Sequence, residues 1–148
     1  MNPEKFSKIL VAIDGSKNSM AAAEYAVSIA QRNKAELVAL HVLHVPNTEL
    51  YLTSGKKYEE FVDKNQKELD KSFEIISKKA KENQVKFKTE IIKVLPNVAA
   101  GIVTYADKKQ IDLIIIGTRG RSGFKKLVLG SVASEVVTYS SCPVLVIK

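Results

Sequence analysis

Residues Ile111 to Ser131 read IDLIIIGTRGRSGFKKLVLGS and give the clearest indication of the fold. The first six residues, up to Ile116, are almost entirely apolar, which is typical of a strand buried on both faces in a parallel sheet. Glycines begin where this strand ends. Gly117 and Gly120 allow a sharp turn and carry no Cβ that would block a ligand. Ser131 is a good N-cap for a following helix, so the stretch predicts a strand, a glycine loop and a helix start in succession.

This glycine loop has features that suit a phosphate group. Arg119 lies between the two glycines and Arg121 follows, and a guanidinium can donate two hydrogen bonds to phosphate oxygens. Free amides at the start of the next helix attract anions as well. The spacing is that of neither a P-loop nor the dinucleotide fingerprint G-x-G-x-x-G. On spacing alone, a phosphate cradle and a glycine-rich surface loop with solvated arginines both remain open.

The rest of the chain alternates short apolar runs with helical patterns. Apolar runs predict strands at 9–13, 36–43, 84–94, 111–116 and 144–147, and apolar residues at helical spacing predict helices between them, beginning near 16, 57, 96 and 132. Five strands separated by four helices predict an α/β fold. We expect a single doubly wound domain over residues 1–148, with a five-stranded parallel sheet in the order 3-2-1-4-5 and helices on both faces.

This strand order brings distant segments to one crevice. The order reverses between the first and fourth strands, and such sheets bind ligands at the carboxyl ends of the strands at that point. Asp14 follows the first strand and Gly117 follows the fourth. Asp14 can accept hydrogen bonds from a ribose hydroxyl or an adenine edge. Taken alone it is better explained by a turn that bonds its own backbone, but together with the Gly117 loop the ligand contact is favoured. Val42, at the end of the second strand, can form an apolar wall against an adenine.

Composition narrows the class of protein. The chain has 148 residues, of which 45% are hydrophobic and 26% charged, as expected for one globular domain with a sizeable core. A net charge of +7 raises nucleic acid and membrane surfaces as partners. The lysines between Lys56 and Lys88 are interleaved with acids, however, and no aromatic residues alternate with them as a stacking platform requires. We therefore expect no nucleic acid and no membrane partner.

Cysteine and histidine give no sign of a metal site. Cys142 is the one cysteine, so it cannot form an internal disulfide, and its place before Pro143 predicts a small buried side chain. His41 and His44 are three residues apart on one predicted strand, so they point to opposite faces and cannot chelate one metal as a pair. The sequence has neither a signal-peptide pattern nor a membrane-spanning apolar run, which predicts a cytoplasmic protein.

The glycine pattern also resembles that of a known family. The spacing G-x-x-G-x9-G-[ST], here from Gly117 to Ser131, is similar to the nucleotide signature of ATP-binding universal stress proteins. The resemblance covers nearly the whole chain, including the opening KILVAIDGS at 8–16 and the ending CPVLVI at 142–147. It implies the same doubly wound fold and ATP as the ligand.

Position by position, the resemblance implies a set of nucleotide contacts. They are Ala12, Ile13, Asp14, Val42, Gly117, Arg119, Gly120, Gly130, Ser131 and Val132. A divalent metal, Mg²⁺ or Mn²⁺, is expected to accompany ATP, held by phosphate oxygens and water rather than by a protein cage. The resemblance also implies a homodimer, which agrees with an apolar edge strand at Val144–Ile147 that needs cover. The loop at 47–57 departs where the family varies most, so its role stays open.

Three functions fit this pattern. The first is an ATP-binding regulatory or stress-response module that acts through conformation or dimer assembly. The second is an enzyme, a slow ATPase or a nucleotidyl-transfer catalyst, and the third is a ligand-free, chaperone-like dimer. The predicted site has no evident base to orient an attacking water, and Asp14 belongs to its adenosine end. The sequence therefore favours binding over catalysis and predicts no catalytic residue.

Overall fold

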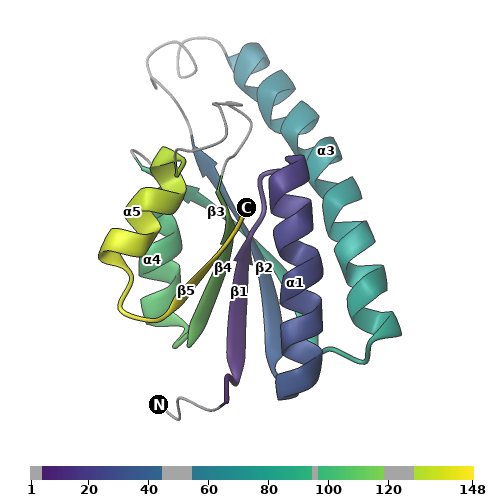
Figure 1. The fold of residues 1–148 in the computed structure, drawn as a ribbon. Coiled ribbons are helices and arrows are strands. Elements are labelled where there is room, and N and C mark those ends of the chain that lie inside the picture. Colours follow the sequence, from purple (N-terminus) through teal and green to yellow (C-terminus); the bar gives the residue numbers. More distant parts are fainter. Residues whose placement is uncertain (1–4, 45–54, 95–96, 119–128) are drawn as a thin grey trace.

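A five-stranded parallel sheet forms the centre of the structure (Figure 1), a computed structural model that describes residues 5–44, 55–94, 97–118 and 129–148. Every neighbouring pair of strands is parallel, and the order is β3-β2-β1-β4-β5. The strands are β1 (Lys8–Ala12), β2 (Glu36–His44), β3 (Phe87–Val94), β4 (Leu113–Gly117) and β5 (Val144–Ile147). The predicted α/β fold and its strand order 3-2-1-4-5 are confirmed.

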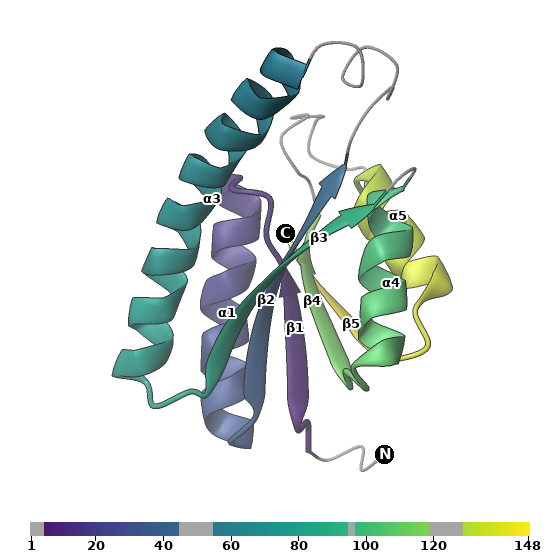
Figure 2. The same ribbon diagram turned by 180° about the vertical axis from the view of Figure 1, so that it is seen from behind.

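Helices cover both faces of this sheet. α1 and α3 lie on one face, and α4 and α5 lie on the other, as the two opposite views show (Figures 1 and 2). The helices are α1 (Lys17–Asn33), α3 (Gly55–Glu82), α4 (Val98–Lys108) and α5 (Ser131–Tyr139). Among the described residues, no helix combines the length and the apolar character that crossing a membrane requires.

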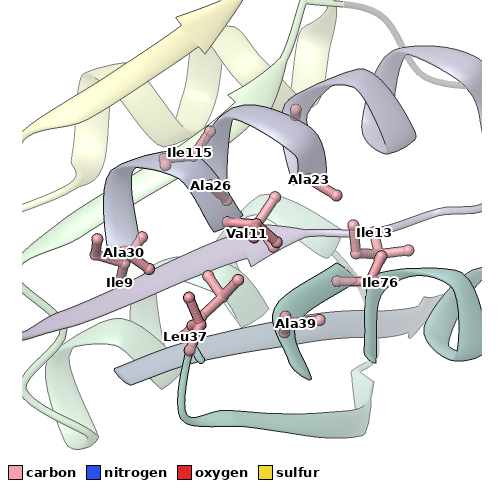
Figure 3. Packing of buried hydrophobic residues seen from close by; sticks show 14 of the residues in the cluster. Ile9, Val11, Ile13, Ala23, Ala26, Ala30, Leu37, Ala39, Ile76 and Ile115 are labelled. Carbon is pink, nitrogen blue, oxygen red and sulfur yellow. The ribbon is translucent and has the colours of Figure 1, made fainter. Parts of the chain in front are cut away.

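The core consists of two hydrophobic clusters, one on each face of the sheet. Successive residues of β1 alternate between them, since side chains of a strand point to opposite faces. Ile9 and Val11 pack towards α1 and α3, whereas Leu10 packs towards α4 and α5. On the α1 side, small alanines such as Ala26 allow the helix to lie close to the strands (Figure 3). Burial on both faces explains why the central strands read as continuous apolar runs.

The start of α1 agrees with the helix predicted to begin near residue 16. Ser16 is the N-cap of α1, and its Oγ accepts a hydrogen bond from the amide of Ser19 at 3.1 Å. The third strand begins three residues later than predicted, because residues 84–86 close α3 instead. There Gln84 takes the left-handed conformation, with φ 58°, and the amide of Val85 bonds the carbonyl of Ala80 at 2.8 Å.

Cys142 is another correction. It is half-buried rather than buried, because it lies in the turn before the edge strand β5.

Candidate functional site

A cavity of about 240 Å³ lies where the strand order reverses. Its walls come from the carboxyl ends of β1, β2 and β4, from the first turns of α4 and from the start of α5. β1 pairs with β2 on one side and with β4 on the other. The connection that follows β1 leads to β2 and the one that follows β4 leads to β5, so the two connections run in opposite directions along the sheet. Doubly wound sheets bind their ligands in such a crevice.

The residues predicted from the sequence meet at this cavity. Those that line it are Ala12, Ile13, Asp14, Val42, Gly117, Gly130, Ser131 and Val132. The other two, Arg119 and Gly120, lie outside the described residues, as does most of the loop at 47–57. The expectation that Asp14 and Gly117 lie at one crevice is therefore confirmed, although more than 100 residues separate them.

Sequence reasoning missed part of the lining. Val98 and Ile102 of α4 line the cavity, but their helical spacing predicts only an inward-facing side and does not distinguish a cavity from a packed core. His41 also lines it, and its Nδ1 lies 2.7 Å from the carbonyl oxygen of Ile13. Because a carbonyl oxygen only accepts, Nδ1 carries the proton in this hydrogen bond. The histidine thus ties β2 to the end of β1, a structural role at the edge of the site.

The turn after β1 fixes Asp14 at the cavity. Its Oδ1 accepts a hydrogen bond from the amide of Ser16 at 2.8 Å, and Gly15 between them has a positive φ of 83°, which glycine adopts without strain. The Oγ of Ser19 donates to the carbonyl of Ser16 at 2.9 Å and closes the turn. Asp14 therefore bonds its own turn and also lines the cavity, and its role as an acceptor for a ligand stays a prediction.

The end of β2 offers backbone groups to the cavity. The last β1–β2 pair is Ala12 with Leu40, and the amide of Ile13 donates to the Leu40 carbonyl at 2.8 Å. In a parallel ladder, alternate residues direct both backbone groups to the same neighbouring strand. Val42, two residues after Leu40, therefore directs its amide and carbonyl to the same side as Leu40. Because β1 has already ended at this level, these two groups point towards the cavity.

The start of α5 forms the opposite end of the cavity. The sequence predicts Ser131 as the N-cap, but Gly130 takes this position and Ser131 is the first helical residue. The helix begins earlier because Gly130 is extended (φ −56°, ψ 157°) and its carbonyl accepts from the amide of Ser134 at 2.8 Å. No side chain among the described residues caps this end. The first-turn amides of residues 131–133, which line the cavity, have no acceptor within the helix.

Both ends of the glycine loop are anchored at the same place. The amide of Thr118 donates to the carbonyl of Ile147 in β5 at 2.9 Å, and the amide of Gly130 donates to the carbonyl of Thr118 at 2.7 Å. A single hydrogen bond therefore joins the residue that follows β4 to the residue that precedes α5. This pairing holds the end of β4 against the start of α5, so that both contribute to one cavity.

The chemical character of the cavity favours binding. In the part of the lining that the structure describes, the titratable residues are Asp14 and His41, and the rest are apolar, glycine or hydroxyl residues. No group of three or more His, Cys, Asp or Glu residues that could hold a metal ion occurs in the described part of the chain. Apolar walls with a few backbone donors and acceptors suit a flat ring system at one end and an anion at the other.

Fold and cavity together define a doubly wound α/β protein with a ligand site at its switch point. The universal stress protein family matches residues 5–148, and the chain belongs to this family. It is 36% identical over 143 residues to universal stress protein MJ0531 of Methanocaldococcus jannaschii, covering 97% of this chain and 82% of that protein. It is 37% identical over 147 residues to universal stress protein YxiE of Bacillus subtilis, covering 97% and 99%.

Solved structures of the family have the same architecture. Universal stress protein UspA from Lactobacillus plantarum has a TM-score of 0.79 at 28% identity, covering 97% of this chain and 99% of that chain. Three more distant structures share the fold. One, in complex with cAMP, has a TM-score of 0.69 at 21% identity, covering 97% of this chain and 98% of that chain; one from Archaeoglobus fulgidus with dAMP has a TM-score of 0.72 at 23% identity, covering 97% and 98%. One from Arabidopsis thaliana with AMP bound has a TM-score of 0.68 at 19% identity, covering 96% and 91%.

Proposed function

We propose that this protein binds an adenine nucleotide, ATP in particular, in the cavity at the switch point, and that it acts as a regulatory module through conformation or dimer assembly. The observation that carries the proposal is the cavity itself: an apolar slot with the backbone of Val42 at one end and the uncapped start of α5 at the other. The family's structures with cAMP, dAMP and AMP support it, because each of those proteins holds an adenine nucleotide on the same fold.

The base end of the cavity favours adenine. A backbone amide and carbonyl at Val42 offer one donor and one acceptor side by side. Adenine presents the complement on one edge, a ring nitrogen that accepts and an amino group that donates, whereas guanine presents a carbonyl oxygen and a ring N–H in those places. The side chain of Val42, together with Val98 and Ile102, supplies apolar surface for the ring.

The phosphate end of the cavity favours an anion. The amides of residues 131–133 need acceptors, and the positive end of the α5 dipole adds to their attraction for a phosphate. A cavity of about 240 Å³ is smaller than the roughly 300–1,000 Å³ typical of pockets that enclose a whole ligand. We infer that it encloses the base and ribose, while the phosphates extend along the start of α5. Arg119 and Gly120 keep their predicted role at the phosphates.

A divalent cation fits this site only through the nucleotide. Asp14 is the one carboxylate among the described residues of the lining, and its Oδ1 already accepts from the amide of Ser16. We therefore propose that Mg²⁺ or Mn²⁺, where it binds, takes its ligands from phosphate oxygens and water. The cation would neutralise phosphate charge and orient the phosphates.

Catalysis is the weaker alternative. A nucleotide hydrolase needs a group that orients the attacking water near the terminal phosphate. Asp14 lies at the carboxyl end of β1 and His41 is bonded to the carbonyl of Ile13, so both belong to the base and ribose end. We propose that any ATP hydrolysis is slow, and that the cytoplasm is the compartment where the protein meets its nucleotide.

A pair of variants at the start of α5 tests the proposal. Ser131→Pro removes one first-turn amide, and the helix tolerates it because proline is favoured at the first helical position and Gly130 is already extended. Ser131→Ala keeps that amide and is the matched control. We expect Ser131→Pro to weaken ATP binding by about 10- to 100-fold in calorimetry, as for the loss of one charge-assisted hydrogen bond, and Ser131→Ala to change it far less. Equal affinities for wild type and Ser131→Pro would contradict the phosphate placement.

We also propose a homodimer through β5. This strand is an edge of the sheet. The carbonyls of Pro143 and Ile147 accept from the amides of Ile114 and Thr118, so odd-numbered residues of β5 face β4 and the amides of Val144 and Val146 face outward. Leu145 adds an apolar side chain that is 36% exposed. A second copy can cover this edge symmetrically, and a dimer mass in light scattering at micromolar concentration tests it.

A further inference from the structure

Gly101 lies inside α4, buried against β2 and β3. Glycine in a helix interior lowers helix stability relative to alanine, so its presence there has a packing reason. A Cβ at this position would lie 2.9 Å from Cγ1 of Val42 and 3.0 Å from Cγ2 of Val94, closer than carbon atoms pack without strain. The helix and the two strands therefore lie at a spacing that leaves no room for a side chain.

This close contact lies directly behind a wall of the cavity. Val42 lines the cavity from β2, and Val98 and Ile102 line it from α4 on either side of Gly101 in the sequence. Valine is branched at Cβ and has one strongly preferred rotamer in most settings. A Cβ at position 101 would therefore displace α4 from β2 or force the methyl groups of Val42 out of their rotamer, and either change alters the slot.

The helix is also tied to the phosphate end of the cavity. The Oδ1 of Asn97 accepts from the amide of Ala100 at 3.2 Å and caps α4. The Nδ2 of the same side chain donates to Oε2 of Glu135 in α5 at 2.9 Å. A displacement of α4 is thus resisted by α5, whose first turn forms the opposite end of the site.

We infer that Gly101 is a positioning residue for the base. Its missing side chain sets the spacing between α4 and β2, and thereby the width of the slot that holds the adenine ring. The inference rests on the proposed function. It means that Gly101, which does not itself line the cavity, contributes to the affinity for the nucleoside part of the ligand.

Two probes separate the base end from the phosphate end. Calorimetry with adenosine and with inorganic tripolyphosphate gives a dissociation constant for each. For Gly101→Ala we expect adenosine to bind about tenfold more weakly, as overpacking of a well-packed site would produce, and tripolyphosphate to stay within about twofold of wild type. Ala100→Ser, which adds one atom at the neighbouring exposed position of α4, is the matched control and should leave both constants unchanged.

A double variant tests the steric cause. Val42→Ala removes the methyl group 2.9 Å from the new Cβ but leaves Cγ2 of Val94 at 3.0 Å, so Gly101→Ala should cause a smaller loss of adenosine affinity in the Val42→Ala background than in wild type. If Gly101→Ala alone does not fold, recovery of folding in the double variant supports the inference, and failure to recover it even after Val94→Ala removes the remaining close methyl group overturns the inference. A wild-type protein that binds neither adenosine nor ATP would overturn the proposed function and this inference together. Equal adenosine affinities for wild type and Gly101→Ala would overturn the inference alone.

Discussion

Gly117→Ala separates two reasons for a glycine at the end of β4. From the sequence, this glycine permits a turn and clears space for a ligand. In the structure, a Cβ at residue 117 would lie 3.0 Å from the backbone oxygen of Asn18, and 3.1 Å from both its carbonyl carbon and its Cβ. These atoms belong to the first turn of α1 and cannot move like the end of a flexible side chain. Gly117 is not among the positive-φ glycines, so backbone strain plays no part.

The expected loss of stability follows from these distances. Overpacking of this kind costs about 1–3 kcal/mol, and the lower half of that range applies because every contact falls short of ordinary packing by only a few tenths of an ångström. Replacing glycine also restricts the unfolded chain, which returns about 0.4–1 kcal/mol. We therefore expect the free energy of unfolding to fall by about 1 kcal/mol, which lowers Tm by about 2–4 °C for a chain of this length.

The assay is urea and thermal unfolding of nucleotide-free protein, compared with wild type. Asn18→Ala combined with Gly117→Ala is a useful control, because Asn18→Ala retains all three contacted atoms and should not restore stability. A Gly117→Ala protein that is as stable as wild type, or more stable, yet binds ATP more weakly would refute the packing argument. In that case clearance for the ligand would be the main reason for the glycine.

Two further predictions concern the alkaline limit of stability and the edge strand. Burial, with Glu90 and Glu36 nearby, raises the pKa of Tyr105 above its ordinary value of 10.0. The stability that the neutral phenol contributes is therefore fully present below pH 10.0, and it is lost as the pH rises through the higher pKa of the folded state. The Tyr105 hydroxyl has no hydrogen-bond partner in the described part of the chain, so Tyr105→Phe should raise the free energy of unfolding by on the order of 1 kcal/mol near neutral pH. Above about pH 10, the free energy of unfolding should fall less steeply with pH in Tyr105→Phe than in wild type. Equal pH slopes for the two proteins in urea denaturation would contradict this prediction. Val146→Pro removes an outward amide of β5 without breaking the hydrogen bonds between β4 and β5, so light scattering should show a folded monomer. Val146→Ala keeps the amide and should be a dimer. A dimeric Val146→Pro protein would count against pairing through this edge.

The fold could be predicted from the sequence because its signals are local and repeated. Apolar runs of strand length alternate with helical patterns, and the helices predicted to begin near residues 16 and 96 are capped by Ser16 and Asn97. The errors occur where two local signals compete. Val85 and Phe87 have the alternation of a strand, but the close of α3 takes the first residues of that segment. Ser131 is a favourable N-cap by residue type, yet Gly130 before it already has the extended backbone.

The site was predicted in part because its parts differ in how they are encoded. Asp14 and Gly117 follow strands, so strand order alone places them at the crevice. Val98, Ile102 and Gly101 contribute through the packing of α4 on β2, and no pattern in the sequence of a helix shows which apolar residues border a cavity. For His41 the sequence argues only against a metal shared with His44, and its bond to the carbonyl of Ile13 gives it a structural role at the edge of the cavity.

In the function that we propose, recognition depends chiefly on the backbone, and this explains why glycines carry so much of the sequence signal. The donors and acceptors that we assign to the ligand are the amide and carbonyl of Val42 and the amides at the start of α5, which any side chain could accompany. What the sequence must encode is the path of the backbone: Gly15 with its positive φ, Gly117 against Asn18 and Gly101 against Val42. A substitution at one of these glycines should therefore affect binding more than the loss of a polar side chain such as the Ser131 hydroxyl, which is the contrast that the Gly101→Ala and Ser131→Ala variants measure.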